Sequence, residues 1–298
     1  NNLGVRVSNL ESRIDNVKWT GKLNYTYERE KVDGFPAGTS NTLLLRLEPT
    51  ATVNDHWKVK ARLDAKWNAK EDQGVDPDGS SRVQLKRAYA MGHYGITEIK
   101  AGLMPYTSEQ TVVFDNTFTG FGVTVGKDQK LEATLLAGRD AGDNVRGINL
   151  NWRPTESFRL AGEYYSQSDL TGNRNIWGVG GTYTFSETAN LSAGYWKNTS
   201  QDNNDLNRAY NVEFNYKGAE KENARSFGLF VAYRHLGAAV AVNQGFDAAV
   251  TGAKGWEIGG DYTFAKNVVG TLKYFDGKGI PAPNTKVNKF YGSLDYFF

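Results

Sequence analysis

The sequence predicts an all-β fold, a transmembrane antiparallel β-barrel of about 16 strands with a short N-terminal coiled-coil helix. Long segments alternate strictly between apolar and polar residues. Long polar connections also alternate with short turns, and the chain ends in an aromatic residue of an alternating segment. No apolar run reaches the length of a membrane-spanning helix, so any membrane residence must depend on strands.

Composition narrows the range of functions. The 298 residues contain no cysteine, which excludes disulfides, thiolate metal sites and a cysteine nucleophile. The formal net charge is +2 and no basic run is present, so a nucleic-acid partner is not expected. A glycine-rich phosphate motif is absent, and we expect no cofactor. The chain starts at Asn1 without a signal peptide, so we expect further sequence upstream.

The segment 57–69 is the clearest strand. Its odd positions are apolar, from Trp57 to Ala69, and its even positions are polar and mostly cationic. This period of two places the two sets on opposite faces, and about 9 to 11 tilted residues suffice to cross a bilayer. The polar face then needs water, which within a membrane is found only inside a closed barrel. Alone, the segment also fits a half-exposed strand of a soluble sandwich.

Residues 3–17 are the one segment with helical spacing. Its apolar residues recur at intervals of four and three, the pattern of a coiled-coil seam, and a helix this short is marginal without partner copies. The alternative is a helix that folds against the barrel mouth or plugs it. We therefore divide the chain into a stalk end, 1–16, and a barrel, 17–298. The seam residues are Leu3, Val7, Leu10, Ile14 and Val17.

Long connections alternate with short ones along the barrel segment, as in outer-membrane barrels with long outside loops and short periplasmic turns. The strand count depends on residues 236–254. Counted as one long loop, they leave an even total of about sixteen strands with both chain ends on one side, and eighteen is the alternative. Long connections are expected near 31–41, 70–81, 106–119, 141–145, 167–174, 197–207, 236–254 and 277–288.

The final strand ends the chain on an aromatic residue. Its apolar positions alternate with polar or aromatic ones, and such an exposed edge invites aggregation unless a barrel closes over it. The segment resembles the C-terminal targeting strand of Gram-negative-type outer-membrane barrels. The alternative is a soluble edge strand that ends in Phe by chance. The residues that carry the resemblance are Phe290, Leu294, Tyr296 and Phe298.

Over residues 17–298 the strand pattern resembles the general diffusion porins, which are sixteen-stranded trimers with a third loop folded into the lumen. The heptad that runs straight into a first strand at Lys18 is similar to the OmpM-type porins of diderm Firmicutes. This resemblance implies a homotrimer in outer-membrane lipid that passes ions and small hydrophilic solutes. It also implies a tether to peptidoglycan through a domain upstream of Asn1. The alternatives are a mainly structural anchor barrel and a substrate-specific sugar channel.

Cationic residues recur at inward positions of the second, third and fourth predicted strands. Neighbouring strands lie about 4.8 Å apart, so these side chains should stack as one basic wall that sets ion selectivity. The alternative is that they only keep the lumen wet. The predicted wall consists of Arg46, Lys58, Lys60, Arg62, Lys66, Arg82 and Lys86.

The third long connection, 106–119, mixes the acids Glu109 and Asp115 with apolar residues. We predict that it folds inward as a constriction loop, with its apolar side on the wall and its acids facing the basic wall. Opposed charges would then produce a transverse field across the pore. The alternative is a loop that latches onto a neighbouring subunit.

No enzyme activity or metal site is expected. Of the three histidines, His56 lies beside a turn, His93 has outward parity and His235 lies at the outer rim without a Ser or Asp motif nearby. The acids Asp72, Asp76 and Asp78 are predicted to form a solvated turn, with calcium binding as the alternative. The alternation in each strand places Trp196 on the inward face and the other tryptophans on the outward face. A row of inward tryptophans on which sugar rings could stack is therefore not expected.

Overall fold

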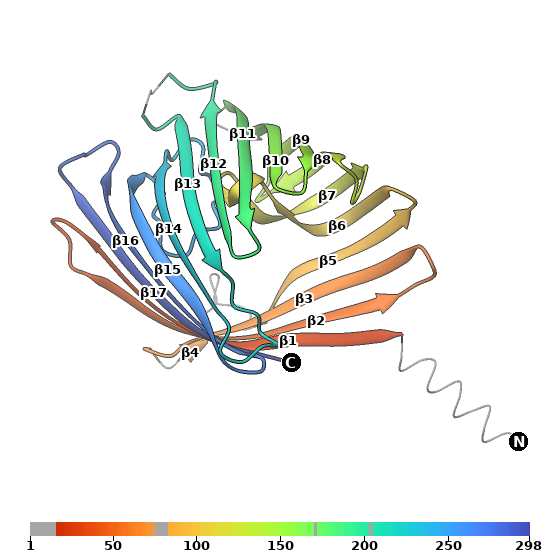
Figure 1. The fold of residues 1–298 in the computed structure, drawn as a ribbon, viewed down its shortest axis with the longest axis horizontal. Helices are drawn as coiled ribbons and strands as arrows, with labels where there is room; N and C mark the ends of the chain where they lie inside the picture. Colours follow the sequence, from red (N-terminus) through yellow and green to blue (C-terminus); the bar gives the residue numbers. More distant parts are fainter. Residues whose placement is uncertain (1–15, 72, 75–82, 170–171, 203–204) are drawn as a thin grey trace, which may run out of the picture.

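The computed structural model describes residues 16–71, 73–74, 83–169, 172–202 and 205–298. They form one sheet of 17 strands that closes on itself, because β17 pairs with β1 (Figure 1). The strand β4 (Gln73–Gly74) has two residues and pairs only with β3, so the other sixteen strands form the wall. This confirms the predicted sixteen-stranded barrel, with residues 237–252 as a single long connection.

Every wall strand is antiparallel to the strands that precede and follow it in the chain.

Among the described residues, no helix is both long and apolar enough to cross a bilayer. The wall strands are β1 (Val17–Val32), β2 (Gly38–Thr52), β3 (Trp57–Asn68), β5 (Val83–Tyr94), β6 (Thr97–Thr107), β7 (Asp115–Val125), β8 (Leu131–Asp140), β9 (Asp143–Thr155), β10 (Phe158–Asp169), β11 (Gly172–Ser186), β12 (Ala189–Asn198), β13 (Arg208–Lys217), β14 (Phe227–Leu236), β15 (Ala253–Ala265), β16 (Val268–Gly279) and β17 (Lys286–Phe297).

The alternation of residue types decides which side chains face outward. Large apolar residues such as Trp19 and Leu272 are about 60 % exposed on the outer surface, whereas the residues between them face the lumen. The strands are longer than predicted, because polar residues near the loops still pair with their neighbours. The loop predicted at 31–41 is only 33–37, and the connection predicted at 106–119 is only 108–114. Asp115 is therefore the first residue of β7 and not part of a loop.

The predicted coiled-coil seam lies mostly outside the described residues, at Leu3, Val7, Leu10 and Ile14. Its last member, Val17, is corrected. It is the first residue of β1 and pairs with Ala51 of β2, so it belongs to the barrel wall.

A β-bulge in β5 changes which residues face the lumen. Arg62 of β3 lies opposite Arg87, but Leu63 lies opposite Leu85, so Lys86 is an extra residue without a partner on β3. One extra residue reverses the parity of everything that follows it. The inward residue beside Arg62 is therefore Arg87 and not Lys86. For the same reason His93 faces inward, 3.3 Å from Glu98, where simple alternation predicted an outward side chain.

The barrel closes where the first strand meets the last. Gly21 and Phe298 exchange two backbone hydrogen bonds of 2.9 and 3.1 Å, and Lys22 forms a 2.6 Å ion pair with Asp295. A Cβ on Gly21 would lie 2.8 Å from the Phe298 ring, so the glycine makes room for the terminal aromatic side chain. The aromatic chain end thus completes the wall, which agrees with the expectation that a barrel covers this edge.

Candidate functional site: the barrel lumen

The basic wall on β2 and β3 is built around one buried acid. Asp64 is 2 % exposed and accepts hydrogen bonds from both Arg46 and Arg62, with shortest distances of 2.9 and 2.6 Å. All three residues face the lumen because they alternate with outward apolar residues on paired strands. Charge-assisted pairs of this kind are short and directional. The acid holds the two guanidinium groups in place and neutralises one of them.

Three lysines of β3 complete this wall without ion-pair partners. In the part of the chain that the structure describes, Lys58, Lys60 and Lys66 form no ion pair. Arg87, which the sequence pattern missed, lies 3.8 Å from Glu48 at the edge of this group. Of the predicted wall, Arg82 lies outside the described residues. Cations therefore outnumber acids on this wall.

Residues 108–114, between β6 and β7, fold against the inner wall. The Ser108 hydroxyl accepts hydrogen bonds from the backbone amides of Val113 and Phe114, at 3.0 and 2.9 Å, and so closes the loop on itself. The side chains of Val112, Val113 and Phe114 are completely buried, and they belong to the main apolar cluster of the protein. We call this segment the first inner loop. Burial of its apolar side chains in this cluster favours the inward position of the loop.

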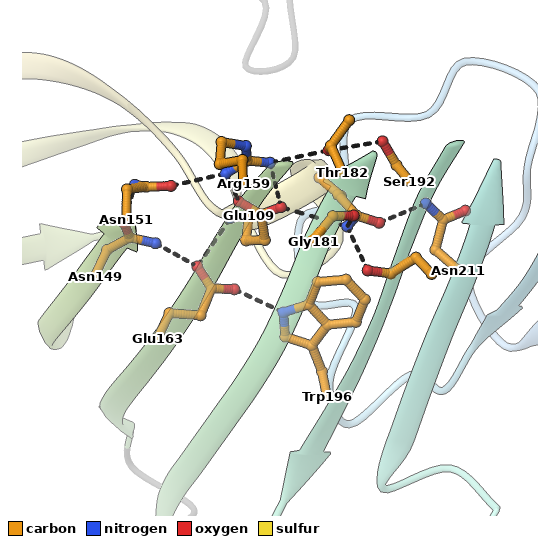
Figure 2. A network of polar contacts seen from close by, with 12 residues as sticks. Glu109, Asn149, Asn151, Arg159, Glu163, Gly181, Thr182, Ser192, Trp196 and Asn211 are labelled. Carbon is orange, nitrogen blue, oxygen red and sulfur yellow. Dashed lines mark hydrogen bonds and ion pairs between the residues drawn. The ribbon is translucent and has the colours of Figure 1, made fainter. Parts of the chain in front are cut away.

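Glu109 fastens the first inner loop to the wall at β10. It lies in a 3-10 turn, η1 (Glu109–Thr111), and its carboxylate receives two hydrogen bonds from Arg159 of β10, at 2.7 and 2.6 Å (Figure 2). Next to it, Gln110 adopts a left-handed backbone conformation with φ of 51°. Its amide donates to the Ala193 carbonyl and accepts from Asn211, both at 2.9 Å. These contacts span β10 to β13.

Glu163 is the buried centre of the same network. One carboxylate oxygen accepts from the Glu109 amide at 2.8 Å, and the other accepts from the Trp196 indole at 2.7 Å (Figure 2). The first oxygen also accepts from the Tyr165 hydroxyl at 2.7 Å. Trp196 is fully buried and covers Gly178, where a Cβ would clash with its ring. Trp196 therefore faces inward as predicted, but its ring offers no open face to a solute.

The predicted partner for Glu109 is corrected by this geometry. Glu109 is 6 % exposed and pairs with Arg159, so its charge is compensated on its own side of the barrel and does not face the cations of β3. Asp115 starts β7 and accepts a 3.3 Å hydrogen bond from Thr107. The sequence pattern detected the inward segment but not the cation that binds it, because Arg159 lies 50 residues away on another strand.

A second loop also enters the lumen, where the sequence pattern predicts only a long outside connection. Residues 237–252, here called the second inner loop, join the first inner loop through backbone hydrogen bonds. Asn243 donates to Val113 at 3.0 Å and accepts from Asp115 at 2.7 Å, and Gly245 donates to Thr111 at 3.0 Å. The available signal was composition. Residues 238–242 are all Ala or Val, which is unusual for a connection exposed to water.

The tip of the second inner loop contacts charged wall residues. The Phe246 ring lies over the Arg234 guanidinium, with 3.7 Å between the ring centroid and Cζ of Arg234. Asp247 forms a 2.6 Å ion pair with Lys273. Arg234 is itself held by Glu213 and Glu257. A cavity of about 350 Å³ lies between both inner loops and the wall of β12 to β16. The two loops thus occupy one side of the lumen, and within the described residues Lys58, Lys60 and Lys66 form no hydrogen bond or ion pair with either.

The histidines do not form a catalytic arrangement. His235 is buried, stacks on Tyr210 and makes a 3.0 Å hydrogen bond to the Asp205 carbonyl. His56 stacks on Tyr94 and bonds the His93 carbonyl at 3.0 Å. Within the described ranges, no group of three or more His, Asp or Glu side chains is arranged to hold a metal ion. The proposed turn at Asp72, Asp76 and Asp78 lies outside these ranges.

Replacing Arg159 by Met is expected to lower the free energy of unfolding by about 2 kcal/mol, because Glu109 would keep a buried carboxylate without a cation. Amide hydrogen exchange of residues 109–114 should accelerate in the same variant. Reversible unfolding in urea with the protein in detergent or lipid vesicles would give the first quantity, and exchange detected by mass spectrometry the second.

The control for this prediction is the double variant Arg159→Met, Glu109→Gln. It removes the charge together with its partner, so it should be more stable than the sum of the two single effects implies. Strict additivity of the two single substitutions would contradict a direct anchor between these residues.

Comparison with known proteins reveals likeness in fold without likeness in sequence. No family model matches the chain, and no curated protein matches it. A mutant of the Rh. blastica porin aligns with a TM-score of 0.60 and 15% identity, over 95% of this chain and 100% of that one. OmpT, an outer membrane protein of Vibrio cholerae in trimer form, aligns with a TM-score of 0.61 and 12% identity, over 95% and 99%. The chain therefore has the sixteen-stranded barrel fold of these porins.

Proposed function

We propose that the chain is an outer-membrane porin, a passive diffusion channel for ions and small hydrophilic solutes. The observation that carries this proposal is the distribution of charge across one closed wall. Lys58, Lys60 and Lys66 face the lumen, whereas the apolar residues that alternate with them, such as Val59 and Leu63, face outward. A wall that is apolar outside and cationic inside suits a water-filled pore in lipid. No covalent chemistry or energy source is required.

The channel should favour anions. The lysines of β3 have no ion pair among the described residues, whereas the acids Asp64, Glu109 and Glu257 are each paired with an arginine. Uncompensated lumen charge raises the local concentration of the opposite ion. In this proposal the inner loops narrow the passage, and the basic wall sets selectivity along the open side. Trp196 is buried, which favours a general channel over a sugar-stacking one.

We also propose that the barrel is a homotrimer, in line with the trimer form of the Vibrio cholerae OmpT structure. A band of five alanines faces outward on the neighbouring strands β3, β5 and β6, interrupted by Leu63 and Leu85 on the same face. Small side chains let barrel walls approach closely. The band consists of Ala61, Ala65, Ala88, Ala90 and Ala101.

The tethering role stays a proposal that the position of β1 supports. This strand begins at the short-turn end of the barrel, where the Asn16 carbonyl accepts from the Thr52 amide at 2.9 Å. β1 therefore starts at the end of the barrel that would face the cell wall in an outer membrane. The heptad in residues 3–17 supports joining of several copies there, and an upstream domain would bind peptidoglycan. The final residues to Phe298 would act as the targeting strand for insertion.

The test is single-channel recording of the purified protein in a planar bilayer, with the reversal potential measured across a potassium chloride gradient. We expect large conductance steps in groups of three and a reversal potential that indicates preference for chloride. Absence of steps from protein that is folded by circular dichroism would contradict the channel and favour the mainly structural anchor barrel. Steps that a sugar saturably blocks would instead favour the substrate-specific channel.

A further inference from the structure

A group of cations lies on the outside of the barrel, at the loop end of four neighbouring strands. The strands are β15, β16, β17 and β1, which meet where the barrel closes (Figure 1). The residues share the outward parity of exposed Trp256, Leu272 and Tyr296 on the same strands. We call these residues the rim patch. The rim patch consists of Arg29, Lys31, Lys254, Lys278 and Lys286.

The register places three of these lysines side by side. Lys278 lies directly opposite Lys254 on one side and Lys286 on the other. Like charges in directly opposed positions destabilise a sheet. No member of the rim patch forms an ion pair within the described part of the chain. The three lysines therefore repel one another, whereas neutral polar residues at these positions would not.

The nearby acids do not neutralise the rim patch. Asp276 accepts a 2.6 Å hydrogen bond from Asn288, and Asp33 accepts one of 3.3 Å from the backbone amide of Lys286. Neither carboxylate lies within ion-pair distance of a rim-patch cation. The cations thus keep a surplus of positive charge on the surface that faces lipid.

A groove beside the rim patch has the mixed character of a lipid headgroup site. It has a volume of about 450 Å³ and combines two cations, Arg29 and Lys31, with aromatic rings on either side. A guanidinium group presents paired donors that match a phosphate, and aromatic rings are suited to the boundary between acyl chains and headgroups. The groove residues are Tyr27, Arg29, Lys31, Tyr274, Asn288 and Phe290.

The opposite ends of the same strands differ. Near the short turns the outward positions of these four strands are apolar or aromatic and carry no charge. They are Val17, Trp19, Phe264, Val268, Tyr296 and Phe298. The positive charge is therefore confined to the membrane leaflet at the loop end.

We propose that the rim patch binds the phosphate groups of a lipid headgroup in the leaflet at the loop end, with the acyl chains along the apolar wall below. This inference rests on the membrane location in the proposed function. Charge complementarity selects the occupant, because each exposed Lys or Arg near an anionic lipid surface adds favourable energy that neutral headgroups cannot supply. The repulsion between Lys254, Lys278 and Lys286 is relieved when a multivalent anion lies across them.

Native mass spectrometry of the full chain in an uncharged detergent tests this site. Diphosphorylated lipid A, phosphatidylcholine and inorganic phosphate would be titrated separately. The wild type should bind lipid A at least about tenfold more tightly than phosphatidylcholine, and added salt should weaken the binding. The triple variant Arg29→Gln, Lys278→Gln, Lys286→Gln should lose about tenfold in lipid A affinity.

The matched control removes the same charge at the opposite end of the barrel, through Lys130→Gln, Lys221→Gln and Lys266→Gln. It should bind lipid A as the wild type does. Equal loss in both triple variants, or no loss in the rim variant, would overturn the proposal. So would dissociation of the oligomer without a change in lipid affinity, which would mean that a second copy covers the patch. Tight binding of inorganic phosphate alone would also overturn a lipid site.

The conductance of the rim variant separates this inference from the proposed function. The rim residues face away from the lumen, so its single-channel conductance should equal that of the wild type. A barrel that conducts but has no rim-dependent lipid binding refutes the lipid site alone. A barrel that binds lipid A through the rim but never conducts refutes the channel alone.

Discussion

Replacing residues 240–249 by a short Gly-Ser linker is expected to raise the single-channel conductance about twofold, because conductance depends on the open cross-section of the lumen. The second inner loop would no longer contact Arg234 or Lys273. A short linker can close the gap, since the Gly252 amide donates to the Leu236 carbonyl at 2.7 Å at the base of the loop. Planar-bilayer recording measures the change.

The control is an equivalent linker in place of residues 281–284, which are all exposed at the loop end and do not enter the lumen. That variant should keep the wild-type conductance. The milder variant Phe246→Ala, Asp247→Asn guards against misfolding, because it leaves the chain length unchanged while removing both tip contacts. It should raise conductance or increase current noise. Wild-type conductance and noise in both loop variants would mean that the second inner loop does not narrow the pore.

Charge reversal of the free lysines should reverse ion preference. In the triple variant Lys58→Glu, Lys60→Glu, Lys66→Glu, the anion to cation permeability ratio is expected to fall about tenfold, with a change in the sign of the reversal potential. Each substitution replaces a positive lumen charge by a negative one on the same strand. The effect should shrink at high salt, because screening shortens the range of wall charges.

The conservative triple variant, with arginine at positions 58, 60 and 66, serves as the matched control and should retain anion preference. Circular dichroism and thermal unfolding would establish that both triples are folded. Unchanged preference for anions in the glutamate triple would mean that the inner loops, and not the basic wall, select ions.

The fold followed from local patterning. In β3 the residues alternate without a break over twelve positions, so one face is apolar and the other cationic whatever the neighbouring strands do. The even strand number followed in the same way, because tight turns such as 266–267 fix which end of the barrel each connection occupies. The alternating aromatic C-terminal segment indicated a strand whose edge must be paired, and β17 pairs with β1.

Local patterning failed where a single residue or a distant partner decided the outcome. The bulge at Lys86 leaves the alternation of residue types in β5 ambiguous, and only pairing with β3 places Arg87 and not Lys86 beside Arg62. The site residues Arg159 and Glu163 looked like ordinary lumen positions of β10. They gain their role because the first inner loop places Glu109 against β10, within hydrogen-bond distance of both residues. Such contacts cannot be predicted from local sequence, because the residues are far apart in the chain and come together only in the folded barrel.

The sequence by itself determined the closed sixteen-stranded wall, its cationic face on β3 and the inward tendency of an apolar third loop. These properties depend on periodicity and hydrophobicity, which act within one strand or one turn. Only the tertiary structure decided that Glu109 is neutralised by Arg159, that a second loop joins the first inside the lumen, and that Lys254, Lys278 and Lys286 lie in a row. The row of lysines arises from register between strands, because pairing brings distant residues opposite each other. The other two features arise because loops pack inside the lumen and bring residues that are distant in sequence into contact.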